Sequence, residues 1–272
     1  GLWWAIALGV VWALLLGLCF AAWLHRVHAT QFPGMSAAQW RSTAYFAGAI
    51  GGASEMTLIA ERQGARTDLV AAAHSLRVLL VTVSIPFALQ WAGVHGIDPL
   101  APTARVVNAD GLAALAGITL AGGLLMQRLG RANPWFMGAL VATMVVTLAG
   151  VSLSALPVAL TDAAQLAIGV SLGVRFTPAF AHTAPRWLGS VALASFVMMG
   201  LCAGFGWLMA RLTGLHPVTM LLGTAPGGIA EMAITAKVLQ LGVPVVTAFQ
   251  VCRLVAVLIL AEPVYRWRHR QT

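Results

Sequence analysis

Three apolar runs in this chain, at residues 2–24, 187–210 and 243–261, are each about as long as a bilayer is thick. A helix rises 1.5 Å per residue, so about 20 residues cross a hydrocarbon core of about 30 Å. Only 9% of the residues are charged, against roughly a quarter in soluble domains. The runs also lack the alternation of membrane β-strands. The sequence therefore predicts an all-α, polytopic helical membrane protein.

The chain matches itself at a shift of 176 residues. Gly51-Gly52-Ala53-Ser54-Glu55-Met56 aligns with Gly227-Gly228-Ile229-Ala230-Glu231-Met232, and without a gap Arg77 then aligns with Arg253. A carboxylate and an arginine, both rare in an apolar chain, thus recur 22 residues apart in each copy. Internal repeats of this kind are typical of secondary transporters.

The predicted elements form two repeats joined by a linker. Residues 1–92 correspond to the C-terminal half of a first repeat, with spans at 2–24 and 69–91 and a broken element at 42–61. A linker follows at 93–110. Residues 111–268 correspond to a full second repeat, with spans at 111–127, 134–150, 162–178, 187–210 and 243–265 and a broken element at 217–239. Counterparts of the elements at 111–178 are expected ahead of residue 1, so the first repeat is interpreted as truncated.

The distribution of basic residues tests the topology, because cytoplasmic loops near membrane spans collect Lys and Arg. If all nine elements crossed, the loop charges would divide seven to seven. If 42–61 and 217–239 instead enter and leave on one side, Arg77 and Arg253 are intramembrane and only three basic residues, Arg105, Arg211 and Lys237, lie outside. The inside then holds Arg26, Arg41, Arg62, Arg66, Arg128, Arg131, Arg175, Arg186, Arg266, Arg268 and Arg270. This bias favours re-entrant hairpins, and five crossings per repeat would invert the second copy.

Helix breakers lie in the middle of both proposed hairpins. Gly51-Gly52 interrupts the first, and Pro226-Gly227-Gly228 interrupts the second. Non-helical backbone at membrane depth is tolerated only where protein covers it or where it lines a cavity. The two hairpin tips are therefore the predicted binding site.

A carboxylate inside a membrane is costly, which makes Glu55 and Glu231 functional candidates. Arg77 or Arg253 is the expected partner, within one repeat or across the two. Two interpretations stay open at this point. The pairs either fix each hairpin to the next helix, or the carboxylates bind a coupling proton or cation.

The tip residues have a similar pair of interpretations. Free N–H groups at Gly51, Gly52, Gly227 and Gly228, helped by the Ser54 hydroxyl, could bind a small anion at a helix N-terminus. The glycines could equally serve only a tight turn. His74 and Gln250 occupy equivalent positions three residues before the arginines, where they either contact substrate or form interhelical hydrogen bonds.

These motifs resemble the AbrB-like membrane protein family, whose duplicated halves each carry P-G-G-x-x-E-M followed by a helix with an arginine. The second copy, Pro226 to Met232, fits this motif completely, whereas the first has Ile50 in place of proline. Asn133-Pro134-Trp135-Phe136-Met137-Gly138 is a further match. Members have been labelled membrane regulators of gene expression or ammonia monooxygenases. The only H-x-x-H spacing is His25-Arg26-Val27-His28, and no E-x-x-H grouping accompanies it, so neither a metal, a cofactor nor an enzymatic activity is predicted.

The sequence thus predicts a secondary transporter of a small anionic or zwitterionic metabolite, coupled to a proton or sodium gradient, in the bacterial inner membrane. The alternative is a membrane regulator that binds a ligand at the same site without moving it. The expected partners are the substrate, the lipid bilayer and a second copy of the chain. The dispersed arginines form no stripe, so nucleic acid is not an expected partner.

Overall fold

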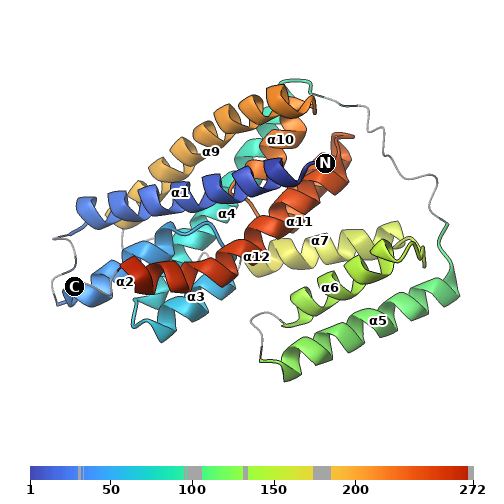
Figure 1. Cartoon of the computed structure of the whole chain (residues 1–272), viewed down its shortest axis with the longest axis horizontal. Helices are drawn as coiled ribbons and strands as arrows, with labels where there is room; N and C mark the ends of the chain where they lie inside the picture. Colours follow the sequence, from blue (N-terminus) through green and yellow to red (C-terminus); the bar gives the residue numbers. More distant parts are fainter. Residues whose placement is uncertain are drawn as a thin grey trace. The chain divides into compact units, whose positions relative to one another are not determined.

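The computed structural model describes residues 1–29, 32, 34–94, 96, 106–130, 134–173 and 185–268. Over these ranges the chain forms eleven α-helices and no strand (Figure 1). Five helices are long and apolar enough to cross a membrane: α1 (Trp3–Val27), α4 (Thr67–Trp91), α5 (Ala109–Arg128), α9 (Pro185–Thr213) and α12 (Val243–Arg268). The predicted class, a helical membrane protein, is confirmed. Most of the predicted linker 93–110, and the end of the predicted span 162–178, lie outside the described residues.

The helices divide into two compact units. The larger unit comprises residues 1–101 and 176–272, and the smaller comprises residues 102–175. Besides α1, α4, α9 and α12, the larger unit holds four short helices: α2 (Ala37–Gly48), α3 (Ala53–Arg62), α10 (Pro217–Thr224) and α11 (Ile229–Val238). It therefore collects α2, α3 and α4 with α10, α11 and α12, which match at the 176-residue shift, together with α1 and α9, which precede them in the two copies.

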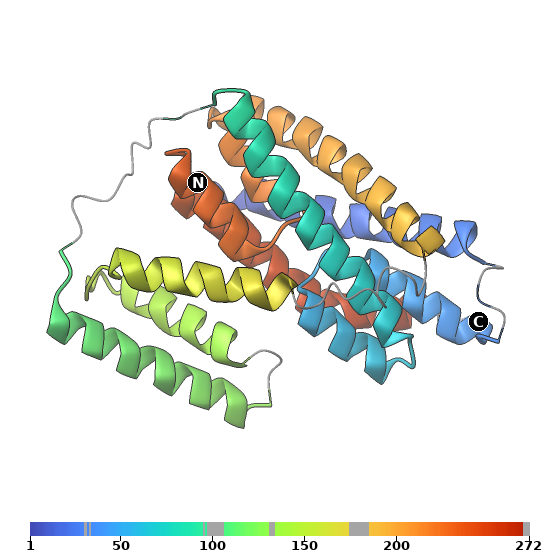
Figure 2. The same ribbon diagram turned by 180° about the vertical axis from the view of Figure 1, so that it is seen from behind.

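Contacts within the larger unit are reciprocal between the two copies. α1 packs on α2 as α9 packs on α10, and α4 contacts α2 and α3 as α12 contacts α10 and α11. α1 also contacts α12, as α9 contacts α4. The helices α9 and α4 lie side by side in Figure 2. Finally, α4 contacts α11 of the other copy, and α12 contacts α3 in the same way. Each long helix after a broken element therefore supports its own copy and touches the other.

Small residues allow the helices of the larger unit to approach closely. A Cβ on Gly48 of α2 would lie 2.5 Å from the backbone nitrogen of Ala21 in α1. Small residues that let backbones meet are typical of helix packing in membranes. Around this contact, the buried side chains of Phe20, Leu24 and Phe46 belong to a core built from both copies.

The smaller unit consists of α5, α6 (Pro134–Leu148) and α7 (Val158–Gly173). Its contacts are also made through glycine, since a Cβ on Gly138 of α6 would lie 2.3 Å from the backbone of Gly122 in α5. The buried residues of α5 and α6 are all glycines, Gly111, Gly123 and Gly138. Apolar side chains such as Leu125 and Val145 remain exposed on these helices, as expected for surfaces that face lipid.

Candidate functional site

Both broken elements are interrupted at the paired glycines. Residues 49–52, the first tip, separate α2 from α3, and residues 225–228, the second tip, separate α10 from α11. The first residue of each tip leaves the helical conformation, with ψ at 141° for Ala49 and 144° for Ala225. The predicted helix breaks are therefore confirmed.

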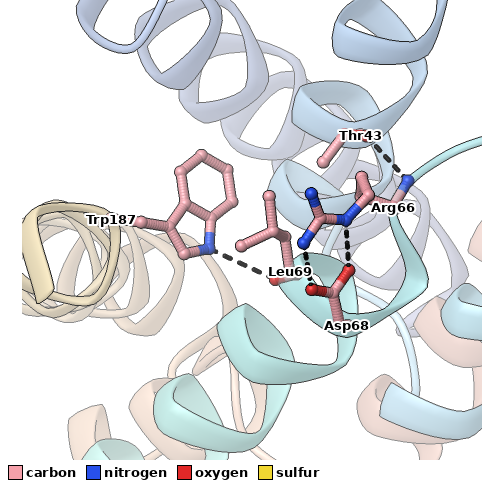
Figure 3. Close-up of polar contacts among 5 residues, drawn as sticks. All are labelled: Thr43, Arg66, Asp68, Leu69 and Trp187. Carbon is pink, nitrogen blue, oxygen red and sulfur yellow. Dashed lines mark hydrogen bonds and ion pairs between the residues drawn. The ribbon is translucent and has the colours of Figure 1, made fainter. Parts of the chain in front are cut away.

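The chain turns back after each tip. The backbone N–H of Arg66, just before α4, donates to Thr43 Oγ1 at 2.9 Å (Figure 3). At the equivalent place in the second copy, a Cβ on Gly242 would lie 3.2 Å from Thr219 Cγ2. Thr43 and Thr219 belong to α2 and α10, so each second arm ends beside its first arm. We call α2–α3 and α10–α11 the first and second helix pairs.

Side-chain contacts fix the corner at which α4 begins. Arg66 forms an ion pair with Asp68, and the indole N–H of Trp187 donates to the carbonyl of Leu69 at 3.2 Å (Figure 3). The hydrogen bond to Asp68 raises the pKa of Arg66 above its usual value, so the arginine stays charged. Trp187 is fully buried at the start of α9. The corner therefore ties the first helix pair to a helix of the other copy.

The second glycine of each tip lies directly under a glutamate. A Cβ on Gly52 would be 2.0 Å from Glu55 Oε2, and a Cβ on Gly228 would be 2.0 Å from Glu231 Oε2. Real Cβ atoms almost never approach another atom within 3.0 Å. Glycine is therefore required at both positions as long as the carboxylate stays where it is.

The first glycine of each tip lies against the methionine that follows the glutamate. A Cβ on Gly51 would be 2.8 Å from Met56 Cγ, and one on Gly227 would be 3.0 Å from Met232 Cε. Met56 and Met232 are fully buried. The spacing of the repeated Gly-Gly-x-x-Glu-Met motif thus has a steric cause, because each glycine makes room for one of the two side chains.

Both glutamates occupy the third position of a helix whose N-cap is the second tip glycine. A glutamate at this position in a capping box reaches back toward the N-cap, and the helix dipole favours a negative charge there. Glu55 is 5% exposed, whereas Glu231 is half-buried. The placement of each carboxylate over its N-cap glycine fits these roles in stabilising the arm.

The two arginines donate to backbone carbonyls at the tips. Arg77 Nη1 donates to the carbonyl of Ala49 at 2.8 Å, and Arg77 Nη2 donates to that of Ala47 at 2.5 Å. Arg253 Nη1 donates to the carbonyl of Ala225 at 2.5 Å, and Nη2 to that of Gly227 at 2.7 Å. Each guanidinium group therefore donates to carbonyls at or just beyond the C-terminal end of α2 or α10. A positive charge is favourable at such a helix end.

The Glu–Arg ion pairs, one of the interpretations that the sequence offered, are not found between the described residues. Over the described ranges, the ion pairs are Arg66 with Asp68 and Arg266 with Glu262. Neither joins a tip glutamate to Arg77 or Arg253. The helix ends supply the physical reason, because the last carbonyls of α2 and α10 have no N–H partner within the helix and attract the guanidinium groups.

His74 and Gln250 contact carbonyls beside those that the arginines use, and Gln250 shares one of them, that of Ala225. His74 Nε2 lies 2.9 Å from the carbonyl of Phe46, and Gln250 Nε2 donates to those of Leu222 at 2.7 Å and Ala225 at 3.1 Å. Phe46 and Leu222 are equivalent at the 176-residue shift. The interhelical hydrogen bonds that the sequence offered as one interpretation of these residues are therefore present.

Three buried polar atoms at the tips have no hydrogen-bond partner within the described residues: Arg77 Nε, Arg253 Nε and Gln250 Oε1. The two arginines are 2% and 7% exposed. The face of Phe20 covers Arg77, with the ring centroid 5.3 Å from Cζ. Each copy thus holds one buried arginine with an unused donor at its tip.

The remaining candidates divide by exposure. Pro226 is buried, and Ile50, its counterpart in the first tip, is only 4% exposed. Ser54 is exposed, so its predicted contribution to the tip is not observed. Residues on one face of a helix are three or four positions apart, whereas Ser54 follows Gly52 by only two. Ser54 therefore does not share the face of α3 that contacts α4. Direct contact between the two tips stays a prediction, although Val81 of α4 packs against Gly227 of the second tip.

Sequence reasoning did not identify the threonines and carbonyls that complete the site. Thr43 and Thr219 match at the same shift of 176 residues, so extending the self-alignment upstream of the glycines would have shown them. The carbonyls of Ala47, Ala49 and Ala225 carry no side-chain signal. In the described part of the chain, no group of three or more His, Cys, Asp or Glu residues could hold a metal ion.

Comparisons with known proteins place this chain among membrane proteins with regulatory names. The profile of the family described as Transition state regulatory protein AbrB matches residues 1–269. The chain is 28% identical over 247 residues to "Uncharacterized protein YhjN" of Bacillus subtilis, a match that covers 84% of this chain and 63% of that protein. It is 27% identical over 276 residues to "Putative regulator AbrB" of Escherichia coli, covering 97% of this chain and 74% of the relative.

The chain therefore spans less than two thirds of the Bacillus relative and about three quarters of the Escherichia coli relative. No solved structure matches it. The family profile covers all the elements that form the site, from the first helix pair to Arg253. The chain belongs to the AbrB family of membrane proteins.

Proposed function

We propose that this protein is a secondary transporter that moves a small anionic or zwitterionic metabolite by alternating access. The supporting observation is the arginine pair, Arg77 and Arg253, with an unpartnered Nε–H on each buried side chain. Burying a cation costs several kcal/mol, and carbonyl dipoles offset only part of that cost. A carboxylate or a phosphate would offset more, because it accepts charge-assisted hydrogen bonds from guanidinium groups.

The two copies are, in this proposal, inverted-topology repeats, and each helix pair is a re-entrant hairpin. The reciprocal helix contacts and the return of each second arm to its first arm support this layout. In transporters of this kind, broken elements of both repeats form one binding site near the membrane midplane. The two tips and the arginine pair would then enclose the substrate in a multi-pass protein of the bacterial inner membrane.

The carboxylates supply a candidate for ion coupling. Glu231 is half-buried over its N-cap glycine and has no ion pair with Arg253. A proton or sodium ion could therefore bind there as substrate enters. The proposal requires no cofactor and no chemical change of the substrate, and nucleic acid is not a partner.

Uptake into proteoliposomes tests this proposal. The purified chain is reconstituted, and accumulation of radiolabelled carboxylates, amino acids and inorganic anions is measured with and without a proton or sodium gradient. Arg77→Lys and Arg253→Lys keep the charge and lose the planar fork, so we expect at least a tenfold loss of uptake. Arg211→Lys, at an exposed arginine stacked on Trp207, is the matched control and should leave uptake unchanged.

The second candidate is a membrane regulator that binds the same ligand without moving it. The name of the Escherichia coli relative, a putative regulator, favours this candidate. Saturable binding that requires Arg77 and Arg253, without accumulation inside vesicles, would support it. Accumulation against a gradient would contradict it.

A further inference from the structure

A second cluster of arginines lies away from the tips. It lines a cavity of about 240 Å³ between α1, α2 and the end of α12, far larger than a single water needs. The residues around it are Ala21, Ala22, His25, Arg26, Arg41, Ala44, Tyr45 and Arg268. We refer to this cavity as the arginine pocket. Three helices thus each contribute one arginine to a shared space.

Among the described residues, none that lines the arginine pocket is acidic. Its three arginines take part in neither of the ion pairs found among the described residues. The acidic side chain of α12 closest in sequence, Glu262, already accepts from Arg266 at 2.6 Å and from Gln63 at 3.0 Å. The positive charge of the pocket is therefore available to an anion from outside the chain.

The position of the pocket favours an anion at the membrane surface. Arg26 lies in the last turn of α1, and Arg268 ends α12, and both helices are long and apolar enough to span a membrane. Trp267 beside it is 77% exposed, as expected for an aromatic side chain at the level of lipid headgroups. Alanines form the apolar part of the lining. The pocket thus combines cations with an apolar wall at the end of two spans.

We propose that the arginine pocket binds the phosphate of an acidic phospholipid headgroup. Guanidinium groups bind phosphate oxygens through paired hydrogen bonds, and basic pockets between membrane helices are suited to anionic headgroups. The same chemistry would accept inorganic phosphate, so the experiment must separate the two sources. Lipid binding at this pocket does not depend on transport at the tips.

Lipid selectivity of the purified full chain tests this proposal. Binding is measured by native mass spectrometry and by thermal unfolding in detergent micelles that contain either phosphatidylglycerol or phosphatidylcholine. The pocket variant carries Arg26→Gln, Arg41→Gln and Arg268→Gln. The control variant carries Arg62→Gln, Arg128→Gln and Arg211→Gln, three exposed arginines outside the pocket, and so has the same change of charge.

We expect the wild type and the control variant to prefer phosphatidylglycerol, and the pocket variant to lose at least about tenfold in apparent affinity for it. Equal losses in both variants would overturn the proposal, because the effect would then follow from total charge. The lipid assignment would be overturned in favour of a soluble anion if millimolar inorganic phosphate displaced the lipid and if phosphate alone raised the unfolding temperature. If the triple variant does not fold, Arg41→Lys is measured instead. This change keeps the positive charge, so a loss of lipid selectivity would still show that the geometry of the pocket is needed.

Discussion

The two helix pairs share their tips and differ in what holds them. Both place a carboxylate over the second glycine, a methionine against the first, and an arginine on the carbonyl of the first tip residue, Ala49 or Ala225. The supporting residues differ: His74 stands where the second copy has Gln250, and Ile50 where it has Pro226. Features kept in both copies are those that the geometry of the tip requires. Features that changed are exchangeable means of supporting it.

The exchange of His74 for Gln250 is informative about chemistry. Both side chains contact the equivalent carbonyl, that of Phe46 or Leu222, and both are fully buried or nearly so. Glutamine does not titrate, so the role common to both copies is hydrogen bonding rather than proton transfer. Under the proposed transport function, a coupling ion would therefore bind at the glutamates, which both copies retain.

The largest expected effect comes from replacing each arginine by methionine. Arg77→Met leaves the carbonyls of Ala47 and Ala49 without their charged donors, at a cost of about 2–6 kcal/mol. Arg253→Met should cost less, about 1–3 kcal/mol, because Gln250 still donates to the carbonyl of Ala225. Thermal unfolding in detergent measures the difference, and equal losses would show that Gln250 does not compensate.

The same variants test whether an ion pair was missed. Without one, Arg253→Met and Glu231→Gln should be additive within about 0.5 kcal/mol, and so should Arg77→Met and Glu55→Gln. A coupling energy well above that value in either cycle would restore the Glu–Arg pairing that the described ion pairs exclude. Cycles across the copies, such as Arg77→Met with Glu231→Gln, complete the comparison.

The tip glycines come next. Gly52→Ala and Gly228→Ala each place a methyl group against a carboxylate at the far end of a flexible side chain, so we expect a cost of at most about 1–3 kcal/mol, and less for Gly228→Ala because Glu231 is more exposed than Glu55. Gly200→Ala in α9 is the control, because nothing lies within 4 Å of the added Cβ and alanine favours the helix. A second change, Glu231→Ala, should relieve Gly228→Ala. Absence of that relief would mean that strain in the backbone, and not the carboxylate, requires glycine.

The success of sequence-based prediction follows from which features leave a side-chain signal. The apolar spans, the paired glycines and the equivalence of Arg77 and Arg253 are patterns of residue type, so the sequence alone predicted them. The carbonyl partners of the arginines could not be predicted, because a backbone carbonyl such as that of Ala49 is the same at every residue. The grouping of α5, α6 and α7 into a separate unit was equally invisible, since glycines such as Gly138 allow close packing without an apolar pattern.

A smaller effect is expected where the supports differ. His74→Gln introduces the residue of the second copy and should preserve the hydrogen bond to Phe46, so the loss of stability should stay below about 1 kcal/mol. His74→Leu removes the donor and should cost about 1–3 kcal/mol. The pH profile of uptake should not change in His74→Gln. A shifted profile would show that His74 titrates during transport and that the two copies differ in chemistry.

The smallest effect concerns the start of the helix that follows each pair. α4 begins with the exposed Arg66–Asp68 ion pair, whose side chains are 41% and 49% exposed, whereas α12 has Pro244 in its first turn. Exposed ion pairs contribute little, so Asp68→Asn should cost at most about 1 kcal/mol. Salt near 1 M should abolish that cost, because the screening length falls to about 3 Å. The hydrogen bond from the Arg66 N–H to Thr43 Oγ1 would survive both changes. Thr43→Val should therefore cost more than Asp68→Asn in high salt, and the opposite order would assign the return of the first helix pair to the ion pair instead.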